Sequence, residues 1–317
     1  MRHLETGHFP SLEITIGKIT NGEKLWQRLY KFPDIGICFF YSGLANKEHL
    51  GNVIALYPYI NFPMINCGFY KFSFRFGTGL GYITKPYNRT ENYKDIAIGS
   101  HLNAAINLTF ESNFKLSKKF ILTTGIGLTH FSNSAFKTPN LGINIPTISL
   151  GAYYKLGENN FLSIKKDTVV NKKFQYLISV TGGIKEIYPE DGPKYGTYSL
   201  AFCVLKPLNF KNKLGLGFDL FYNSSIIKLL KNDSINISHN YEILRPGINL
   251  TYEIVISKIS ICLQFGTYVF AKYKLQGDVY EKLGWKYFIT NHIFSTITLK
   301  ANLVDADDFD LGIGYRF

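Results

Sequence analysis

The 317-residue sequence lacks any run of about 18 apolar residues, so no segment is suited to cross a membrane as a helix. It has only two Met and two Trp, and its first residues, Met1-Arg2-His3-Leu4-Glu5, lack the apolar core of a signal peptide. The cysteines are also few, and none has a metal-ligand spacing such as C-x-x-C: Cys38, Cys67, Cys203 and Cys262. We therefore expect no metal site and no organic cofactor.

Aromatic residues, in contrast, make up 16% of the chain, with 22 Tyr and 26 Phe. Aromatic and β-branched residues suit a pleated surface, so this composition favours β-sheet. The mean hydropathy of −0.01 resembles that of a soluble protein. A membrane barrel gives the same average, because its strands alternate between lipid-facing apolar residues and polar lumen residues.

Apolar and polar residues alternate with a period of two along nearly the whole sequence. In 70–76, Tyr70, Phe72, Phe74 and Phe76 alternate with Lys71, Ser73 and Arg75. A soluble β-sandwich also alternates, but two features favour a transmembrane antiparallel β-barrel. The strands approach the ~9–11 residues that cross a bilayer at a tilt, and their polar faces carry Gly, Asn and other small residues.

The alternation predicts about 14 strands, although 12 remain an alternative. An even number returns both chain ends to the periplasm, as in single-chain bacterial barrels. We expect an N-terminal periplasmic or lumen-packed segment at 1–33, with at most a short strand near 12–16, and a barrel over 34–317. The segment 223–245 is expected to be a long extracellular loop with a short amphipathic helix around Ile226–Lys231. The expected strands are 34–42, 50–60, 69–83, 96–111, 118–132, 145–156, 173–184, 196–206, 213–222, 246–255, 258–270, 281–289, 294–303 and 309–317.

The C-terminal strand ends on an aromatic residue, Phe317, after alternating Phe309, Leu311, Ile313 and Tyr315. This pattern is similar to the terminal strand by which bacterial outer-membrane barrels are recognised for assembly. The aromatic final residue favours the terminal strand of a barrel in the bacterial outer membrane over an ordinary amphipathic strand. An exported barrel needs a signal peptide, so this location requires that the peptide has been removed; otherwise the membrane interpretation is wrong.

The formal net charge is +12. One explanation is a set of solvated loops and lumen-lining cations, and the other is attraction to an anionic surface. The basic residues are scattered and form no basic helix or ribbon, which argues against nucleic acid. The sugar-phosphate surface of an outer leaflet is the better candidate partner.

The expected strand 118–132 ends with two polar residues on its apolar face. Phe120, Leu122, Ile126 and Leu128 occupy even positions, and His130 and Ser132 continue that stripe. Residues two apart on a strand share a face, so both would point toward lipid. A neutral imidazole can activate a neighbouring hydroxyl as a nucleophile, and the strand parity places this end outside the cell. The natural substrate there is an acyl ester of an outer-leaflet lipid.

The next expected strand, 145–156, has the same parity, with Ile148, Leu150 and Tyr154 facing lipid. Extending it back by two residues places Asn144 on the same face at the outer end. Asn144 is then placed to accept the second imidazole N–H and to fix the tautomer, as Asn does in Cys/His/Asn hydrolases. An amide orients His but stabilises the imidazolium less than a carboxylate does.

These residues resemble the signature of the lipid A 3-O-deacylases, the PagL-type outer-membrane barrels. The resemblance is dense over about 124–156, with weaker echoes at Gly51-Asn52 and at 99–103. The residues that carry it are His130-Phe131-Ser132-Asn133, Lys137, Pro139-Asn140 and Gly142-Ile143.

The resemblance implies an ester hydrolase that removes the 3-O-linked acyl chain of lipid A, the lipid anchor of lipopolysaccharide. It maps the nucleophile to Ser132 and the base to His130, and it ties Asn133 and Asn140 to the oxyanion site and its support. The third triad member is usually Glu, and Asn144 stands there. Phe131 stands where Tyr is common. The chain is also about twice as long as the short, eight-stranded members.

Other interpretations remain open at this stage. A barrel of about 14 strands is also compatible with a channel, a binding protein or a structural protein, or with an esterase for another outer-leaflet lipid. His101 is expected to point into the lumen beside Asn103 and Asn107 as a packing residue. The acidic group Asp305, Asp307, Asp308 and Asp310 is expected to form a solvated outer turn, with calcium binding as the alternative.

Overall fold

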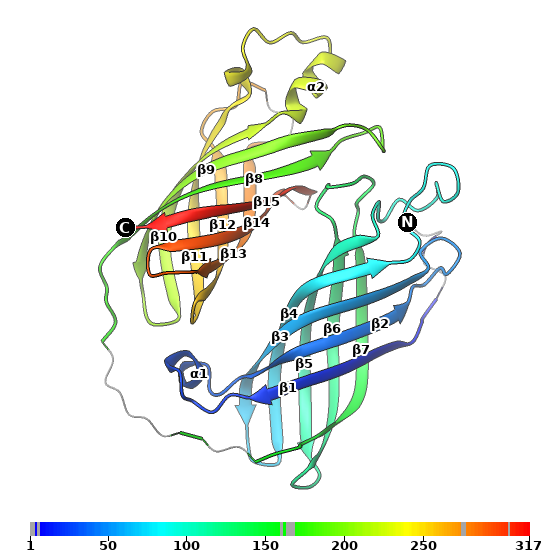
Figure 1. The fold of residues 1–317 in the computed structure, drawn as a ribbon, viewed down its shortest axis with the longest axis vertical. Coiled ribbons are helices and arrows are strands. Elements are labelled where there is room, and N and C mark those ends of the chain that lie inside the picture. Colours follow the sequence, from blue (N-terminus) through cyan, green and yellow to red (C-terminus); the bar gives the residue numbers. More distant parts are fainter. Residues whose placement is uncertain (1–3, 5–6, 159–160, 163–168, 274–276, 304) are drawn as a thin grey trace. The chain divides into compact units, whose positions relative to one another are not determined.

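The computed structural model of the chain describes all residues except 1–3, 5–6, 159–160, 163–168, 274–276 and 304, and it consists almost entirely of β-sheet (Figure 1). The chain divides into two compact units. The first contains residues 1–133 and 139–166, and the second contains residues 134–138 and 167–317. Among the described residues, neither helix is long and apolar enough to cross a bilayer.

The first unit is a seven-stranded antiparallel meander in which each strand pairs with the next along the chain. A short helix, α1 (Leu25–Leu29), lies between β1 and β2. The sheet encloses a cavity of about 1840 Å³ that is lined by residues of both edge strands, β1 and β7. Its strands are β1 (Ser11–Ile19), β2 (Asp34–Gly43), β3 (Asn52–Asn66), β4 (Tyr70–Ile83), β5 (Leu102–Lys115), β6 (Phe120–Ser132) and β7 (Ile143–Tyr154).

The second unit is a closed eight-stranded antiparallel barrel. Its last strand pairs with its first, with Leu311 opposite Gly182 and Ile313 opposite Val180. Its elements are β8 (Gln175–Glu186), β9 (Lys194–Pro207), β10 (Asn212–Asn223), α2 (Ser225–Asn232), η2 (Asn240–Ile243), β11 (Arg245–Ile256), β12 (Ile259–Tyr268), β13 (Val279–Phe288), β14 (Ile293–Asn302) and β15 (Asp305–Arg316).

The all-β fold and the antiparallel barrel architecture are as the sequence predicts, and each of the 14 expected strands is present. The strand count is 15 because β1 is a full strand, where the alternation indicated only 12–16. The grouping also differs from a 1–33 segment followed by one barrel over 34–317. Period-two alternation shows that a strand has an outer and an inner face, but it does not say which strand pairs with the last one.

The connections differ in length between the two ends of each unit. In the first unit, the loop end carries 44–51, 84–101 and 133–142, and the turn end carries 20–33, 67–69 and 116–119. In the second unit, the loop end carries 187–193, 224–244, 269–278 and 303–304, and the turn end carries 208–211, 257–258 and 289–292. Outer-membrane barrels have short periplasmic turns and longer extracellular loops, so the loop ends are the ends that we expect at the cell exterior.

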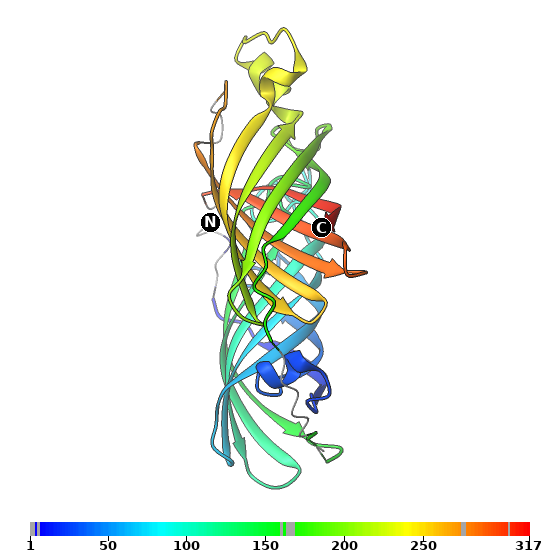
Figure 2. The same ribbon diagram turned by 90° about the vertical axis from the view of Figure 1, so that its left-hand side faces the viewer.

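The predicted amphipathic helix in 223–245 is present as α2, which lies beyond the ends of β10 and β11 (Figure 2). Its buried Ile226 and Leu230 pack with Ile243 of η2 in a small apolar cluster. The longest extracellular connection is therefore a folded cap rather than an open loop.

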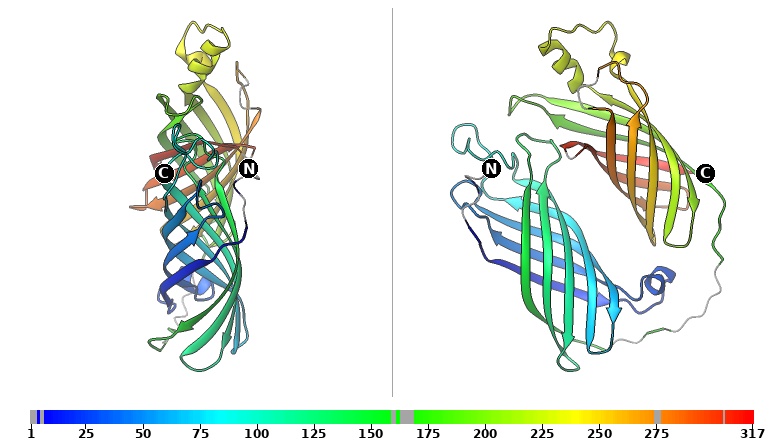
Figure 3. Two further views of the ribbon diagram at one scale, coloured as in Figure 1. Left: turned by 90° about the vertical axis from the view of Figure 1, so that its right-hand side faces the viewer. Right: turned by 180° about the vertical axis from the view of Figure 1, so that it is seen from behind.

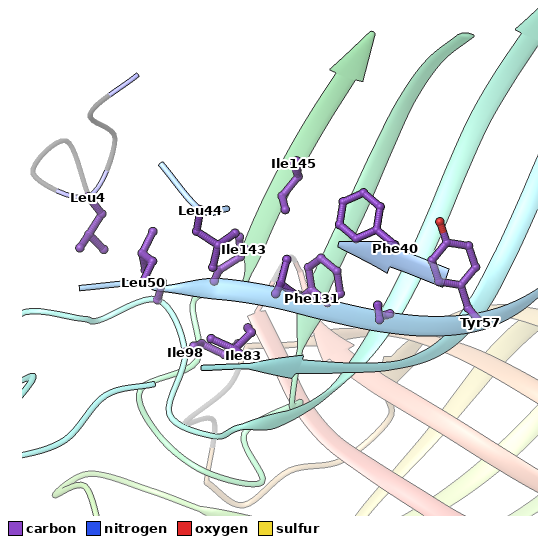
Figure 4. Close-up of a cluster of buried hydrophobic side chains, with 14 of the residues drawn as sticks. Leu4, Phe40, Leu44, Leu50, Tyr57, Ile83, Ile98, Phe131, Ile143 and Ile145 are labelled. Atoms are coloured by element: carbon purple, nitrogen blue, oxygen red, sulfur yellow. The ribbon is translucent and has the colours of Figure 1, made fainter. Parts of the chain in front are cut away.

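The core of the first unit lies inside its sheet, toward the loop end (Figure 4). Phe40 of β2 and Phe131 of β6 are fully buried there, with ring centroids 6.2 Å apart. The same buried cluster contains Val53, Ile83 and Ile143. This packing fixes the loop-end portions of β6 and β7, which Figure 3 shows side by side from behind.

The lumen of the closed barrel is filled by charged side chains in pairs. Glu253 accepts hydrogen bonds from Lys213 at 2.8 Å and from Lys286 at 2.9 Å, and Lys282 bonds Asp219 at 2.8 Å. An eight-stranded barrel is just wide enough for side chains to fill it. Each buried charge faces its counter-charge, so removal of one partner would leave the other charge buried without compensation.

The acidic group near the C-terminus belongs to this lumen, which corrects the expectation of a solvated outer turn. Asp307 and Asp308 bind Lys300, and Asp310 accepts from Thr181 and Thr197 at 3.0 and 2.8 Å. All three carboxylates are buried. These residues belong to β15 rather than to a turn, and the register shift between Lys300 and Ala301 leaves Asp307 as an extra residue, so that the adjacent Asp307 and Asp308 are both buried.

We expect Glu253→Gln to destabilise the second barrel by about 3 kcal/mol or more, because it leaves two buried ammonium groups without their counter-charge. Urea unfolding in lipid vesicles, followed by far-UV circular dichroism, measures this loss. Glu242→Gln is the control, since Glu242 binds Lys272 in the exposed cap, where the lysine lowers the pKa of the carboxyl. Equal stability of both variants would contradict the structural role of the lumen pairs.

Candidate active site on the outer wall

The loop-end part of β6 sends alternate side chains to opposite faces of the sheet. Thr129 and Phe131 are fully buried on the inner face, whereas Ile126 and Leu128 are exposed on the outer one. His130 and Ser132 follow the parity of Ile126 and Leu128 and are half-buried. The two polar residues therefore project from the outer wall, as the sequence pattern predicts.

His130 is oriented by the neighbouring strand. It lies directly opposite Asn144 in the register of β6 and β7, and its Nδ1 is 2.8 Å from Oδ1 of Asn144. With the amide oxygen facing it, Nδ1 donates the proton, which leaves Nε2 as the ring nitrogen able to accept one. The pairing of two strands thus sets both the position and the tautomer of the imidazole.

Gly142 lies close to the imidazole ring of His130. Its φ of +77° is a conformation that glycine adopts readily, and its N–H donates to the carbonyl of Ala97 at 2.9 Å. A Cβ at this position would lie 2.8 Å from Cε1 of His130. The sequence motif contains Gly142, but sequence reasoning gave it no role at the site.

Ser132 belongs to a second hydrogen-bonded group, made with the connection between β6 and β7. Nδ2 of Asn140 donates to Oγ of Ser132 at 3.0 Å. The same Asn140 accepts the backbone N–H of Asn133 at 3.0 Å through its Oδ1. Asn140 therefore ties the serine hydroxyl to the amide of the residue that follows it.

This group extends to the connection between β4 and β5, through residues that sequence reasoning did not assign. Nδ2 of Asn133 donates to Oγ of Ser100 at 2.8 Å, and Oγ of Ser100 donates to Oδ1 of Asn103 at 3.0 Å. The only sequence signal was the weak echo at 99–103. His101 is exposed and stacks on Tyr82, which corrects the expected lumen position, because β5 begins only at Leu102.

All five predicted site residues thus lie in the first unit, at the loop end of one wall. Two groups are formed, His130 with Asn144 and Ser132 with Asn133 and Asn140, and the two anchor residues are two apart on one strand, about 7 Å between Cα atoms. The five side chains contain no carboxylate. No group of three or more His, Cys, Asp or Glu in the described part of the chain is arranged to hold a metal ion.

The apolar outer faces, the filled lumen and the long loops at one end define the chain as an outer-membrane β-barrel protein. It belongs to the lipid A 3-O-deacylase family: residues 16–153 match the model of that family, "Lipid A 3-O-deacylase (PagL)", and residues 174–317 match "Acyloxyacyl hydrolase, C-terminal domain". The two matches correspond to the two sheets, and the first contains all five site residues.

Two of the solved structures that the chain matches are a designed and a natural membrane barrel. A de novo designed transmembrane β-barrel is 10% identical, covering 47% of this chain and 98% of its own, with a TM-score of 0.29. An outer-membrane channel from Pseudomonas putida F1 is 12% identical, covering 97% of this chain and 92% of its own, with a TM-score of 0.21. A search of curated proteins gives no significant match.

We expect Gly142→Ala to displace the imidazole of His130, because the added methyl group would overlap Cε1. Histidine NMR signals in detergent micelles would report a changed environment for His130. Gly68→Ala is a matched control: Gly68 has a φ of +76°, but nothing lies within 4 Å of its added Cβ. An unchanged His130 signal in Gly142→Ala would contradict the contact.

Proposed function

We propose that this protein is an outer-membrane ester hydrolase that removes the 3-O-linked acyl chain from lipid A by a Ser/His mechanism. The observation that supports it most is the outward His130–Asn144 pair, with Ser132 two residues along the same wall. The family match makes lipid A the substrate class.

In this proposal, Oγ of Ser132 attacks the ester carbonyl while Nε2 of His130 takes the hydroxyl proton. The tetrahedral intermediate then expels the sugar 3-oxygen, which receives that proton, and an acyl-serine remains. Water attacks the acyl-serine with His130 again as the base, so a free fatty acid leaves and Ser132 regains its proton. Asn144 holds the imidazole through Nδ1 during both steps.

Asn140 and Asn133 have the donors that the negatively charged carbonyl oxygen needs. Nδ2 of Asn140 already points at Oγ of Ser132, and the backbone N–H of Asn133 lies beside it. Donors aimed at the position of developing charge typically contribute a factor of 10² to 10³ in rate each. Ser100 holds the side chain of Asn133 and so acts as a positioning residue.

The surroundings of His130 and Ser132, the proposed catalytic dyad, suit an acyl chain in a bilayer. Along the outer wall toward the turn end, Leu128, Ile126 and Ile148 are exposed apolar residues, and Ile148 is 89% exposed. The polar residues lie next to the loop end, where headgroups begin. An ester at the boundary between sugar and acyl chain would meet the dyad at that depth.

The channel alternative has weaker support. The lumen of β8–β15 contains buried ion pairs between neighbouring strands, as at Lys213–Glu253, and between strands that are not paired, as at Lys282–Asp219, and these side chains occupy space that a channel would need. An esterase that acts on another outer-leaflet lipid remains compatible with the geometry, and the substrate assay below distinguishes it.

We expect Ser132→Ala to abolish deacylation of lipid A, because it removes the nucleophile. Mass spectrometry of lipid A from an expression host would show loss of one hydroxyacyl chain with the unsubstituted protein and none with the variant. Ser295→Ala, at an outward position of β14 in the second barrel, should retain full activity. Intact lipid A with the unsubstituted protein, together with release of fatty acid from phospholipid, would identify the other esterase.

We expect Asn144→Glu to raise kcat by about tenfold, because a carboxylate stabilises the imidazolium that forms in the transition state. The same stabilisation should move the acidic limb of the pH–rate profile to higher pH, since His130 then keeps its proton longer. Asn144→Ala serves as the comparison and should lower kcat. A pH profile that is identical in all three proteins would show that Asn144 does not act through His130.

A further inference from the structure

The exposed charges of the closed barrel are segregated between its two ends. At the loop end, the lysines Lys228, Lys231 and Lys272 are accompanied by acidic residues of the same connections, among them Asp233 and Glu242. The turn end and the segment that enters β8 contain exposed lysines at 172, 173, 206 and 258. The described residues 169–175, 206–213, 255–260, 287–293 and 315–317 contain no Asp or Glu.

The lumen does not account for the net charge of +12. Its basic residues face acidic ones within hydrogen-bonding distance, as at Glu253, Asp219 and Asp307. The exposed lysines at the turn end, in contrast, have no Asp or Glu in the same described segments. These lysines lie at the end of the second barrel that has the short connections, whereas the sequence favoured an attraction to the outer leaflet.

The first unit shows the same polarity at its own turn end. The connection between β5 and β6 contains exposed Lys118 and Lys119, and Lys115 directly precedes it. Phe120 follows, 53% exposed on the outer wall, with its ring against Tyr154 at 5.2 Å between centroids. Lysines next to a pair of outward aromatic rings thus occur in both units.

Aromatic residues mark where the turn-end lysines lie relative to the bilayer. Tyr176, Tyr287, Tyr315 and Phe317 are exposed at the turn-end part of the second barrel's wall. Such aromatic girdles occupy the headgroup level of outer-membrane barrels. Lys206 extends from the wall with its Nζ 5.5 Å from the ring centroid of Phe174. Its ammonium group therefore lies beside the aromatic girdle.

We propose that the turn-end lysines of the second barrel form a binding surface for anionic phospholipid headgroups, in the leaflet at the end with the short connections. The occupant is a phospholipid rather than a soluble anion, because the charges flank an apolar wall with an aromatic girdle. Lysines near an anionic membrane surface each contribute about a fivefold factor in binding at low salt. The proposal rests on the membrane location alone and is independent of the hydrolase mechanism.

The test measures lipid binding to the full chain by native mass spectrometry in a mild detergent. Dioleoyl phosphatidylglycerol and dioleoyl phosphatidylcholine are added at equal concentrations. The double variant Lys206→Gln/Lys258→Gln removes two turn-end charges, and Lys228→Gln/Lys231→Gln removes two exposed charges from α2 at the loop end. Gel migration with and without heating confirms that all three proteins are folded.

We expect the unsubstituted protein to bind phosphatidylglycerol at least fivefold more than phosphatidylcholine. The turn-end variant should lose most of this preference, and the loop-end variant should keep it. Equal binding of the two lipids by the unsubstituted protein would overturn the proposal. So would an equal loss of preference in both variants, because net charge rather than the turn end would then be responsible.

Discussion

The backbone hydrogen bonds between neighbouring strands are the constraint on which the rest of this structure depends. A bilayer interior has no water to satisfy a backbone N–H or carbonyl, so strands must pair with one another. Pairing fixes the alternation of side chains, and every strand then has one face toward the outside of the sheet and one toward its interior. A polar residue on the outer face gains no partner from the lumen. His130 and Ser132 are recognisable as a site because they break this rule together, on one strand and at the loop end.

The two units have the same antiparallel architecture but carry different residues on their outer faces. The closed barrel places its charges inward, where Glu253, Asp219 and Asp307 each face lysines, and its outward positions are apolar apart from a few residues such as Ser295. The first sheet also pairs charges inside, with Arg75 2.6 Å from Glu13 of β1 and 3.4 Å from Glu111 of β5. Only its wall carries a His-x-Ser sequence within a strand. The candidate site therefore lies in the first unit, and the second contains buried ion pairs, a folded cap and exposed lysines at its turn end.

Much of this could be predicted from sequence because alternation is a local property. The outward direction of His130 follows from its parity with Ile126 and Leu128, and the contact with Asn144 follows from extending the next strand back by two residues. The closure of β15 on β8 could not be predicted, because it depends on a pairing between residues far apart in the chain. Ser100 escaped notice for a similar reason: a loop from another hairpin brings it to Asn133. The Asp307 group was misassigned because acidic clusters are usually solvated, and only the facing lysines show otherwise.

The amide at position 144 decides how this site would work. A carboxylate there would both orient the imidazole and balance its charge, whereas Asn144 offers orientation alone. Without a carboxylate to stabilise the imidazolium, the proposed reaction depends on the positions of His130 and Ser132. Several contacts in the structure fix these positions. The register of two paired strands places His130 opposite Asn144, the absence of a Cβ at Gly142 leaves room for the ring, and Asn140 ties Ser132 to the backbone. A substrate that is anchored in the same leaflet diffuses along the wall in two dimensions, with its ester held near the depth of the dyad. Positioning of this kind replaces part of the entropy that a soluble enzyme must provide through a binding cavity. The proposed esterase mechanism therefore depends more on positioning along the wall than on strong activation of the base.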